Sequence, residues 1–106
     1  MAILQDIAGG RSGDKGPNTN IGLVFKNEKY YKWACDNITA DNVKVYFKTI
    51  VKGNVVRYEL PNLYALNFIL EDSLGGGGSE TLFNDAQGKT YAQALLMMKI
   101  DYKDNL

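Results

Sequence analysis

The sequence contains no histidine, and its 106 residues include a single cysteine, Cys35. The absence of histidine excludes every catalytic triad that uses this residue as its base. One thiol cannot build a disulfide framework, and without histidine it cannot complete a zinc site of the Cys/His type. We therefore expect neither redox chemistry nor zinc.

The chain also lacks an excess of charge and a long hydrophobic run. Lys+Arg and Asp+Glu number 12 each, so no strong global field attracts nucleic acid or an acidic membrane surface. No stretch reaches the roughly 18 apolar residues typical of a membrane-spanning helix. The N-terminal residues 1–6 do not place a basic segment before a long apolar run. We expect a cytoplasmic protein that binds neither nucleic acid nor membrane.

What is present is typical of a globular domain. Hydrophobic residues make up 45% of the chain and charged residues 23%. A length near the modal domain size leaves room for one core. These values predict a single domain over residues 1–106.

The stretch from Arg11 to Gly22 concentrates more polar chemistry than any other. Its glycines and Pro17 allow sharp turns and close approach to a ligand, and its polar side chains carry charge and hydrogen-bonding groups. The pattern predicts a binding loop that leads into a buried strand over 20–26. An ordinary surface loop has the same composition and remains the alternative.

This stretch can bind an anion. Arg11 would bind a phosphate or carboxylate bidentately, Lys15 would act as a point charge, and glycine N–H groups would form an anion-binding nest. The alternative is an internal pairing of Asp14 with Arg11 or Lys15, which would only stiffen the loop. The spacing does not fit a Walker A loop. The candidate ligand-binding residues here are Arg11, Ser12, Gly13, Asp14, Lys15, Gly16 and Asn20.

A second polar set occurs further along the chain, at Arg57, Glu59, Asn62 and Asn67. On a strand, Arg57 and Glu59 share one face. An asparagine in an apolar segment, such as Asn67, needs a hydrogen-bond partner if it is buried. Asn67 is therefore either a structural residue that fixes a neighbouring strand or a further ligand-binding residue.

Periodicity and capping signals predict the remaining elements. They are a strand over 3–8, a helix over 30–38, a helix capped by Thr39 that reaches Ile50, strands over 55–60 and 81–84, a turn over 85–89 and a frayed tail over 101–106. The segment 62–74 fits a helix or a strand, and Gly75 to Gly78 favour the helix because glycine closes helix C-termini. The segment 90–100 fits both equally well. Interleaved strands and helices predict an α+β two-layer sandwich.

Several blocks of the sequence together resemble a known family. The most specific block is Arg11 to Gly16 followed by Asn20 to Gly22. The weaker blocks are Asp6 to Ala8, Arg57 to Leu63, Ala65 to Phe68, Leu74 to Gly77 and Asp85 to Lys89. Nearly the whole chain thereby resembles the AtuA-like ferredoxin-fold family, which comprises the C-terminal domain of the acyclic terpene utilisation protein AtuA and stand-alone proteins of about this size. Pro17 and Gly9-Gly10 depart from the family pattern, in which an acidic residue and bulkier residues are common.

The resemblance implies a ferredoxin-like α+β sandwich with helices on one face of a mainly antiparallel sheet. The name refers to the fold, because Cys35 alone cannot hold an iron–sulfur cluster that needs four thiolates, and we expect no cofactor. The resemblance also implies a setting in the breakdown of branched or hydroxylated acids as coenzyme A thioesters. It implies an AtuA-like large subunit as the partner, and it leaves the substrate and the reaction open.

Two functions fit these observations. The first is an accessory subunit that docks on an AtuA-like large subunit and contributes the stretch 11–20 to a shared site. The second is a self-contained enzyme or binder for an acyl-CoA or hydroxy-acid ligand, with Asp14 as the catalytic acid or base and Arg11 and Lys15 holding the anion. A chain without histidine, a metal set or an activated nucleophile has few routes to acid–base catalysis, which favours the first. A self-associating structural module is a third option.

Overall fold

The computed structural model describes residues 2–15, 18–48, 51, 53–71 and 87–102. In chain order its elements are β1 (Ala2–Ile3), the 3-10 helix η1 (Leu4–Asp6), β2 (Ala8–Lys15), β3 (Asn18–Phe25), α1 (Glu28–Asn37), α2 (Ala40–Tyr46), β4 (Val55–Leu60), the 3-10 helix η2 (Pro61–Leu63), β5 (Ala65–Leu70), α3 (Gln87–Leu96) and β6 (Lys99–Ile100). Among these described residues, no helix is both long enough and apolar enough to span a bilayer.

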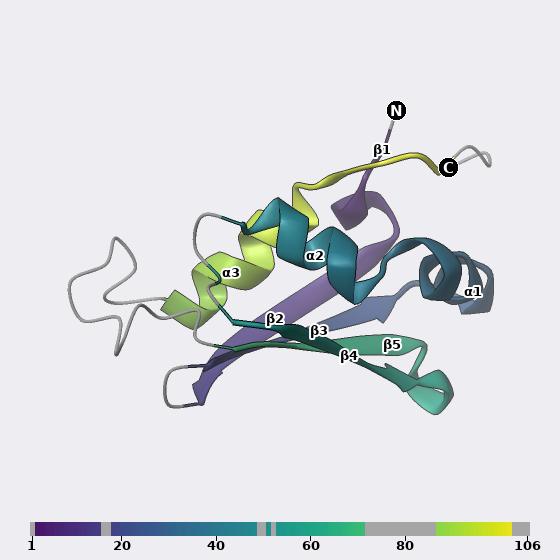
Figure 1. Ribbon diagram of the computed structural model, residues 1–106. Helices are drawn as coiled ribbons and strands as arrows, with labels where there is room; N and C mark the ends of the chain where they lie inside the picture. The colour runs from purple at the N-terminus through teal and green to yellow at the C-terminus, as the bar shows by residue number, and fades with distance from the viewer. Residues whose placement is uncertain (1, 16–17, 49–50, 52, 72–86, 103–106) are drawn as a thin grey trace.

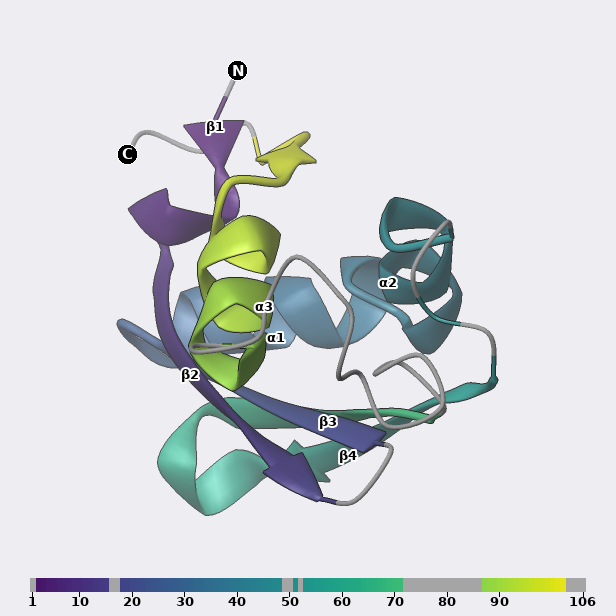
Figure 2. The ribbon, with the colours of Figure 1, turned by 90° about the vertical axis from the view of Figure 1, so that its left-hand side faces the viewer.

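The main sheet is built from two hairpins. Its four strands are antiparallel and lie in the order β2-β3-β5-β4, so the hairpins β2–β3 and β4–β5 join through β3 and β5. The helices α1, α2 and α3 all lie on one face of this sheet (Figures 1 and 2). Strands β1 and β6 pair separately, close to the chain termini (Figure 1). The predicted α+β two-layer sandwich with helices on one face is confirmed.

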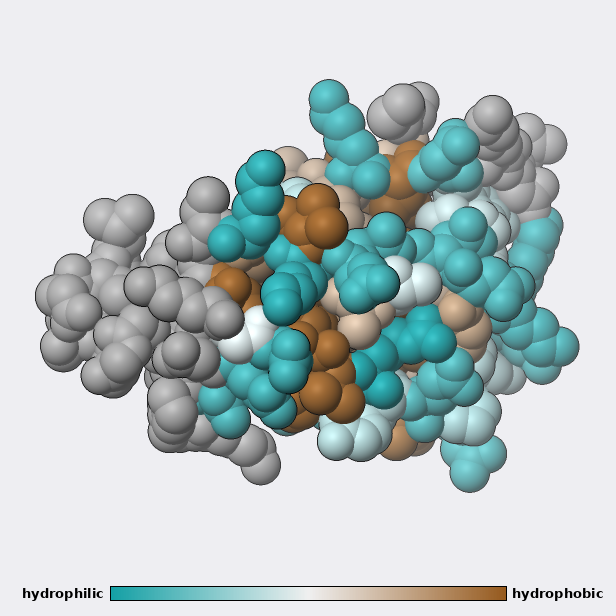
Figure 3. Space-filling view, in the orientation of Figure 1, coloured by the Kyte–Doolittle hydropathy of each residue, from teal (hydrophilic) through white to brown (hydrophobic). Residues whose placement is uncertain are grey.

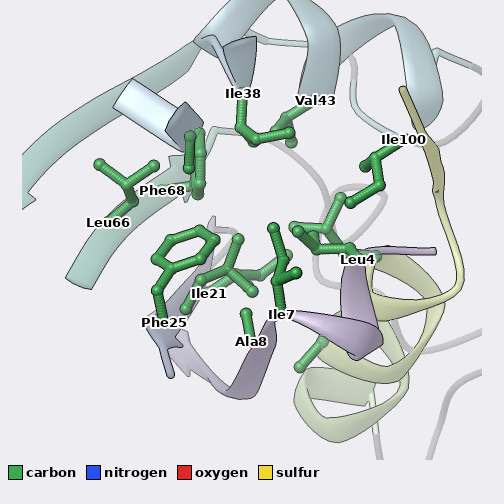
Figure 4. Packing of buried hydrophobic residues seen from close by; sticks show 14 of the residues in the cluster. Leu4, Ile7, Ala8, Ile21, Phe25, Ile38, Val43, Leu66, Phe68 and Ile100 are labelled. Carbon is green, nitrogen blue, oxygen red and sulfur yellow. The ribbon is translucent and has the colours of Figure 1, made fainter. Parts of the chain in front are cut away.

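The core lies between the sheet and the helices. Ile21 of β3 pairs with Phe68 of β5, and both side chains are fully buried. In Figure 4 they point toward Ile38 and Val43, which come from the helical layer. Full burial of such a side chain contributes roughly 1.5–3 kcal/mol. Because side chains alternate along a strand, the intervening residues of β3 and β5 lie on the opposite face of the sheet.

Side-chain caps start both helices that follow β3. The Asn27 side chain accepts a hydrogen bond from the Tyr30 N–H at the start of α1. At α2, Thr39 Oγ1 accepts from the Asn42 N–H at 3.1 Å, and Asn42 Oδ1 accepts from the Thr39 N–H at 2.9 Å. Such reciprocal capping satisfies donors that a helix leaves unpaired. The predicted cap is confirmed, whereas α2 ends at Tyr46, and Ile50 lies outside the described residues.

Hydrogen bonds of the Arg57 side chain connect the sheet to the C-terminal end of α1. Its Nη1 donates to the backbone oxygens of Cys35 and Ile38, both at 2.9 Å, and its Nη2 donates to Glu59 Oε2 at 2.8 Å. Carbonyl groups at the end of a helix have no intrahelical donor, so a guanidinium on β4 supplies one. The predicted shared face of Arg57 and Glu59 is confirmed by this contact.

The strand predicted over 3–8 is wrong for most of its length. Leu4 and Ile7 are both fully buried in the same core, whereas residues three apart on a strand point to opposite faces. The 3-10 turn η1 brings residues three apart onto one side. The Ile3 N–H donates to Asp6 Oδ2 at 2.9 Å and stabilises this turn.

The helix favoured for 62–74 is also wrong, because residues 65–70 form the central strand β5. Leu66, Phe68 and Leu70 are buried because β3 and β4 flank this strand and direct alternate side chains into the core. The chain enters β5 through η2 and through Tyr64, whose φ of 51° lies in the left-handed region.

The C-terminal third resolves one ambiguity and corrects two expectations. The segment 90–100 continues α3 to Leu96 and then enters β6. Because α3 begins at Gln87, the predicted turn over 85–89 is wrong at its described residues. In the predicted frayed tail, Tyr102 is buried and packs edge-on against Tyr30 and Trp33. Gly75 to Gly78 and the strand predicted over 81–84 lie outside the described residues.

Replacing Arg57 with alanine should destabilise the fold, because it leaves helix-terminal carbonyls without their donor. We expect the free energy of unfolding to fall by about 1–3 kcal/mol, measured by urea denaturation. Lys44→Ala removes an exposed charge from α2 and should change stability by less than about 0.5 kcal/mol. Equal effects of the two substitutions would refute this role of Arg57.

Candidate functional site

The predicted binding loop over 11–22 is a β-hairpin, which corrects the expectation from composition. Its backbone pairs run without interruption from Ala8 opposite Phe25 to Lys15 opposite Asn18. A glycine-rich segment favours a loop locally, but pairing with a second strand satisfies the backbone of both. The polar residues of this segment therefore stand on a sheet, and Gly16 and Pro17 lie outside the described residues.

The face of the sheet opposite the helices, here called the open face, gathers several of the predicted site residues. The register places Arg11, Gly22, Asn67 and Tyr58 in one row across the four strands. Side chains in such a row are direct neighbours. The flanking rows are Gly9, Val24, Ala65 and Leu60 on one side, and Gly13, Asn20, Ile69 and Val56 on the other.

A hollow of about 700 Å³ lies on the open face. Its lining includes the polar residues Arg11, Asn20 and Asn67, together with apolar residues from β3, β4 and η2. This volume lies within the range of roughly 300–1,000 Å³ that is usual for small-molecule sites. The sheet thus brings the predicted residues from segments 11–20 and 67 into one site.

Gly9, Gly13 and Gly22 form the floor of this hollow, and no contact with the described residues requires glycine at these three positions. A Cβ added at Gly9 or Gly13 would meet no atom within 4 Å, and one at Gly22 would lie 3.7 Å from Asn67 Oδ1, an ordinary contact. None of the three has a φ in the left-handed region. Glycine in a strand costs about 0.5–1 kcal/mol relative to alanine. Glycine inside a strand often marks a place where a ligand or another backbone comes close.

The two amides in the hollow have no hydrogen-bond partner among the described residues. Asn20 Oδ1 is buried and accepts no hydrogen bond there, a state that costs about 1–3 kcal/mol. Among the described residues, no hydrogen bond joins the Asn67 side chain to a neighbouring strand, and its Oδ1 lies 3.7 Å from the position that a Cβ would take at Gly22 of β3. The Arg11 side chain is exposed. The Arg11 guanidinium and the half-buried Asn67 amide are therefore accessible to a bound molecule, whereas Asn20 Oδ1 is covered.

The other predicted site residues have different positions. Ser12 belongs to the hollow's lining, but its Oγ accepts a hydrogen bond from the Ala92 N–H at 3.1 Å and so faces α3. Asp14 and Lys15 pair with Thr19 and Asn18 through the backbone. Their side chains, like Gly16, lie outside what the structure describes. The catalytic role suggested for Asp14 stays a prediction.

Sequence reasoning missed the apolar side of the hollow. Val24, Leu60 and Leu63 line it and are 54%, 41% and 63% exposed, respectively. The available signal was alternation, because Val24 and Leu60 occupy strand positions out of phase with the core residues. The side chains that line the hollow in the described part of the chain include no carboxylate.

A smaller hollow of about 380 Å³ lies in the helical layer, between α1, α2 and the C-terminal segment. Its amides are already engaged, since Asn37 donates to the Trp33 oxygen and Asn42 caps α2. Hydrophilic residues predominate on the side seen in Figure 3, interrupted by brown areas over α2 and the strands beneath it. This hollow contains none of the predicted site residues.

The groups with shifted pKa values belong to the helical layer. Burial raises the pKa of Tyr31 to about 12, and its hydrogen bond with Cys35 adds to the effect. Burial also raises the pKa of Tyr102, with a smaller contribution from Tyr30. Both phenols are therefore neutral at physiological pH. No cluster of three or more potential ligand side chains among the described residues is arranged to hold a metal ion.

Alanine at Gly13 and at Gly10 should have opposite effects on stability. Gly13 faces open space, so Gly13→Ala should leave the free energy of unfolding unchanged or raise it by about 0.5–1 kcal/mol. Gly10 faces the helices, and its Cβ would approach Leu23 Cδ2 to 3.1 Å and the Gly22 oxygen to 3.2 Å. Gly10→Ala should therefore destabilise the fold in urea denaturation. Destabilisation by Gly13→Ala would show that the fold itself needs that glycine.

The comparisons with known proteins give one result. A family model described as the AtuA ferredoxin-like domain matches residues 2–101. This range contains both hairpins and every residue that lines the hollow. No curated protein and no solved structure matched the chain.

Proposed function

We propose that this chain, which belongs to the AtuA ferredoxin-like domain family, is an accessory subunit or domain of an AtuA-like protein. Its open face contributes an anion-binding surface to a site shared with that protein. The ligand is a branched or hydroxylated acyl compound, presented as a carboxylate or as a coenzyme A thioester during cytoplasmic catabolism of acyclic terpenes.

One observation carries the anion-binding part of this proposal. Arg11 and Asn67 stand on either side of Gly22 in one row, and Asn20 lies in the next row. A guanidinium binds a carboxylate through two parallel hydrogen bonds, and each amide adds N–H donors. Because Gly22 has no side chain, an anionic group can approach the backbone beside Arg11, and rotation of the Asn67 amide, whose Oδ1 lies over Gly22, would turn its N–H groups toward that anion.

The openness of this face supports a shared site over a self-contained enzyme. Small-molecule sites commonly bury about 70–90% or more of a ligand, whereas this hollow is bordered by exposed side chains on a sheet that the described helices leave uncovered. A second protein surface over the face would complete the enclosure. The exposed Tyr58 in the Arg11 row suits such a contact, because tyrosine is enriched in protein interfaces.

Anion binding is tested by titrating the ¹⁵N-labelled chain with hexanoate and following backbone amide shifts by NMR. The shifts should concentrate in β2, β3 and β5. Arg11→Gln should weaken binding about tenfold or more, because a hydrogen bond to a charged group contributes roughly 1.5–3 kcal/mol. Lys44→Ala, which removes a cation from the helical layer, is the matched control. Equal losses in both variants would indicate unspecific charge attraction and overturn the anion site.

The accessory role predicts a stable complex with an AtuA-like protein. The tagged chain, purified from its native cells and analysed by sizing and mass spectrometry, should elute with that protein in a defined stoichiometry. Tyr58→Asp should release the partner, since it places a charge on the open face. Val45→Asp alters a comparably exposed side chain on α2 and should not. Recovery of only a monomer or a self-associated form would overturn the accessory role.

A further inference from the structure

The hollow on the open face has a polar end and an apolar end. Arg11, Asn20 and Asn67 form the polar end, in the rows that contain Gly22 and Gly13. Val24 and Leu60 belong to the adjacent row, and Leu63 follows in η2. A ligand that fills the hollow therefore meets a cation at one end and hydrocarbon at the other.

The apolar end presents exposed side chains from three elements, namely Val24 of β3, Leu60 of β4 and Leu63 of η2. Val24 and Leu60 stand on either side of Ala65, whose small side chain is 4% exposed. The flanking side chains cover Ala65, and the exposed surfaces of Val24 and Leu60 form an apolar surface on which a hydrocarbon chain can lie. Exposed apolar side chains grouped in this way mark a binding surface.

The turn before β5 supplies the third apolar residue. Tyr64 adopts a φ of 51°, which is uncommon for a residue with a side chain. Such backbone outliers cluster at ligand sites. Here the turn is followed at once by β5, and it leaves Leu63 bordering the hollow with 63% of its surface exposed.

We infer that the ligand of this site is an amphipathic monocarboxylate with a defined orientation. Its carboxylate lies between Arg11 and Asn67, and its hydrocarbon chain crosses from this row past Ala65 toward Leu60 and Leu63. This inference rests on the proposed function, since it specifies the ligand of the same anion site. It adds that the apolar end, and not charge alone, selects the ligand.

The test is an NMR titration of the full chain with butanoate, hexanoate and octanoate. Each added methylene should tighten binding by about two- to fourfold, where fourfold corresponds to complete burial at about 0.8 kcal/mol per methylene and an open face buries less. Leu63→Ser should weaken this dependence on chain length, because Leu63 is the most exposed of the three apolar residues, whereas Val24 and Leu60 remain. Val45→Ser, at a similarly exposed position in the helical layer, should preserve it. Arg11→Gln should weaken the binding of all three acids by the same factor and keep the dependence on length.

The possible outcomes separate this inference from the proposed function. Binding that depends on Arg11 but is equal for the three acids would overturn the amphipathic ligand and leave the anion site standing. Binding that Arg11→Gln does not change would overturn both. A dependence on chain length that Leu63→Ser leaves unchanged and Val45→Ser weakens would place the hydrocarbon chain of the ligand at the helical layer and overturn the orientation. Urea midpoints of the variants, all at exposed positions, establish that each one is folded.

Discussion

The pairing of β3 with β5 is the constraint on which both the core and the open face depend. These strands come from distant parts of the chain, and their contact joins the two hairpins into one sheet. The same register sets Ile21 against Phe68 in the core and Gly22 against Asn67 on the open face. A slip of one residue would exchange the two faces of a strand. The buried pairs therefore hold the polar residues of the hollow in place.

Arg11 and Arg57 lie on opposite faces of the sheet, because side chains alternate along each strand. Arg57 faces the helices, where its side chain is 18% exposed and bonds two helix carbonyls and Glu59. Arg11 lies on the opposite face, between Gly9 and Gly13 along β2. The Arg57 guanidinium stabilises the fold through these contacts. The Arg11 guanidinium lies on the exposed face, and under the proposed function its charge binds the anion.

Local sequence signals predicted the features that local forces decide. The Thr39 cap, the helical spacing after residue 30 and the alternation over 55–60 all depend on neighbours a few positions away, and the structure has each of them. The interleaving of strands and helices predicted the two-layer class, and the resemblance to the family implied helices on one face of a mainly antiparallel sheet. The strand β5 could not be recognised in the same way, because its apolar residues fit both periods and two remote strands decide between them. Nor could composition show that Ser12 would face α3 while Arg11 faces away.

Under the proposed function, the glycines on the open face affect ligand binding directly and partner binding through the ligand. A β-branched residue at Gly13 or Gly22 would suit a strand better, so the fold gives up stability where neither contacts nor φ among the described residues require glycine. Under the proposed function, close approach of a bound molecule accounts for this loss. A ligand on the open face still exposes its outer side, and a partner that covers it gains apolar contact with that side. Under the proposed function, ligand and partner therefore strengthen each other's binding by the same factor, because such coupling is reciprocal. On that proposal, an accessory domain that contributes half of the site would make assembly with its partner depend on the ligand.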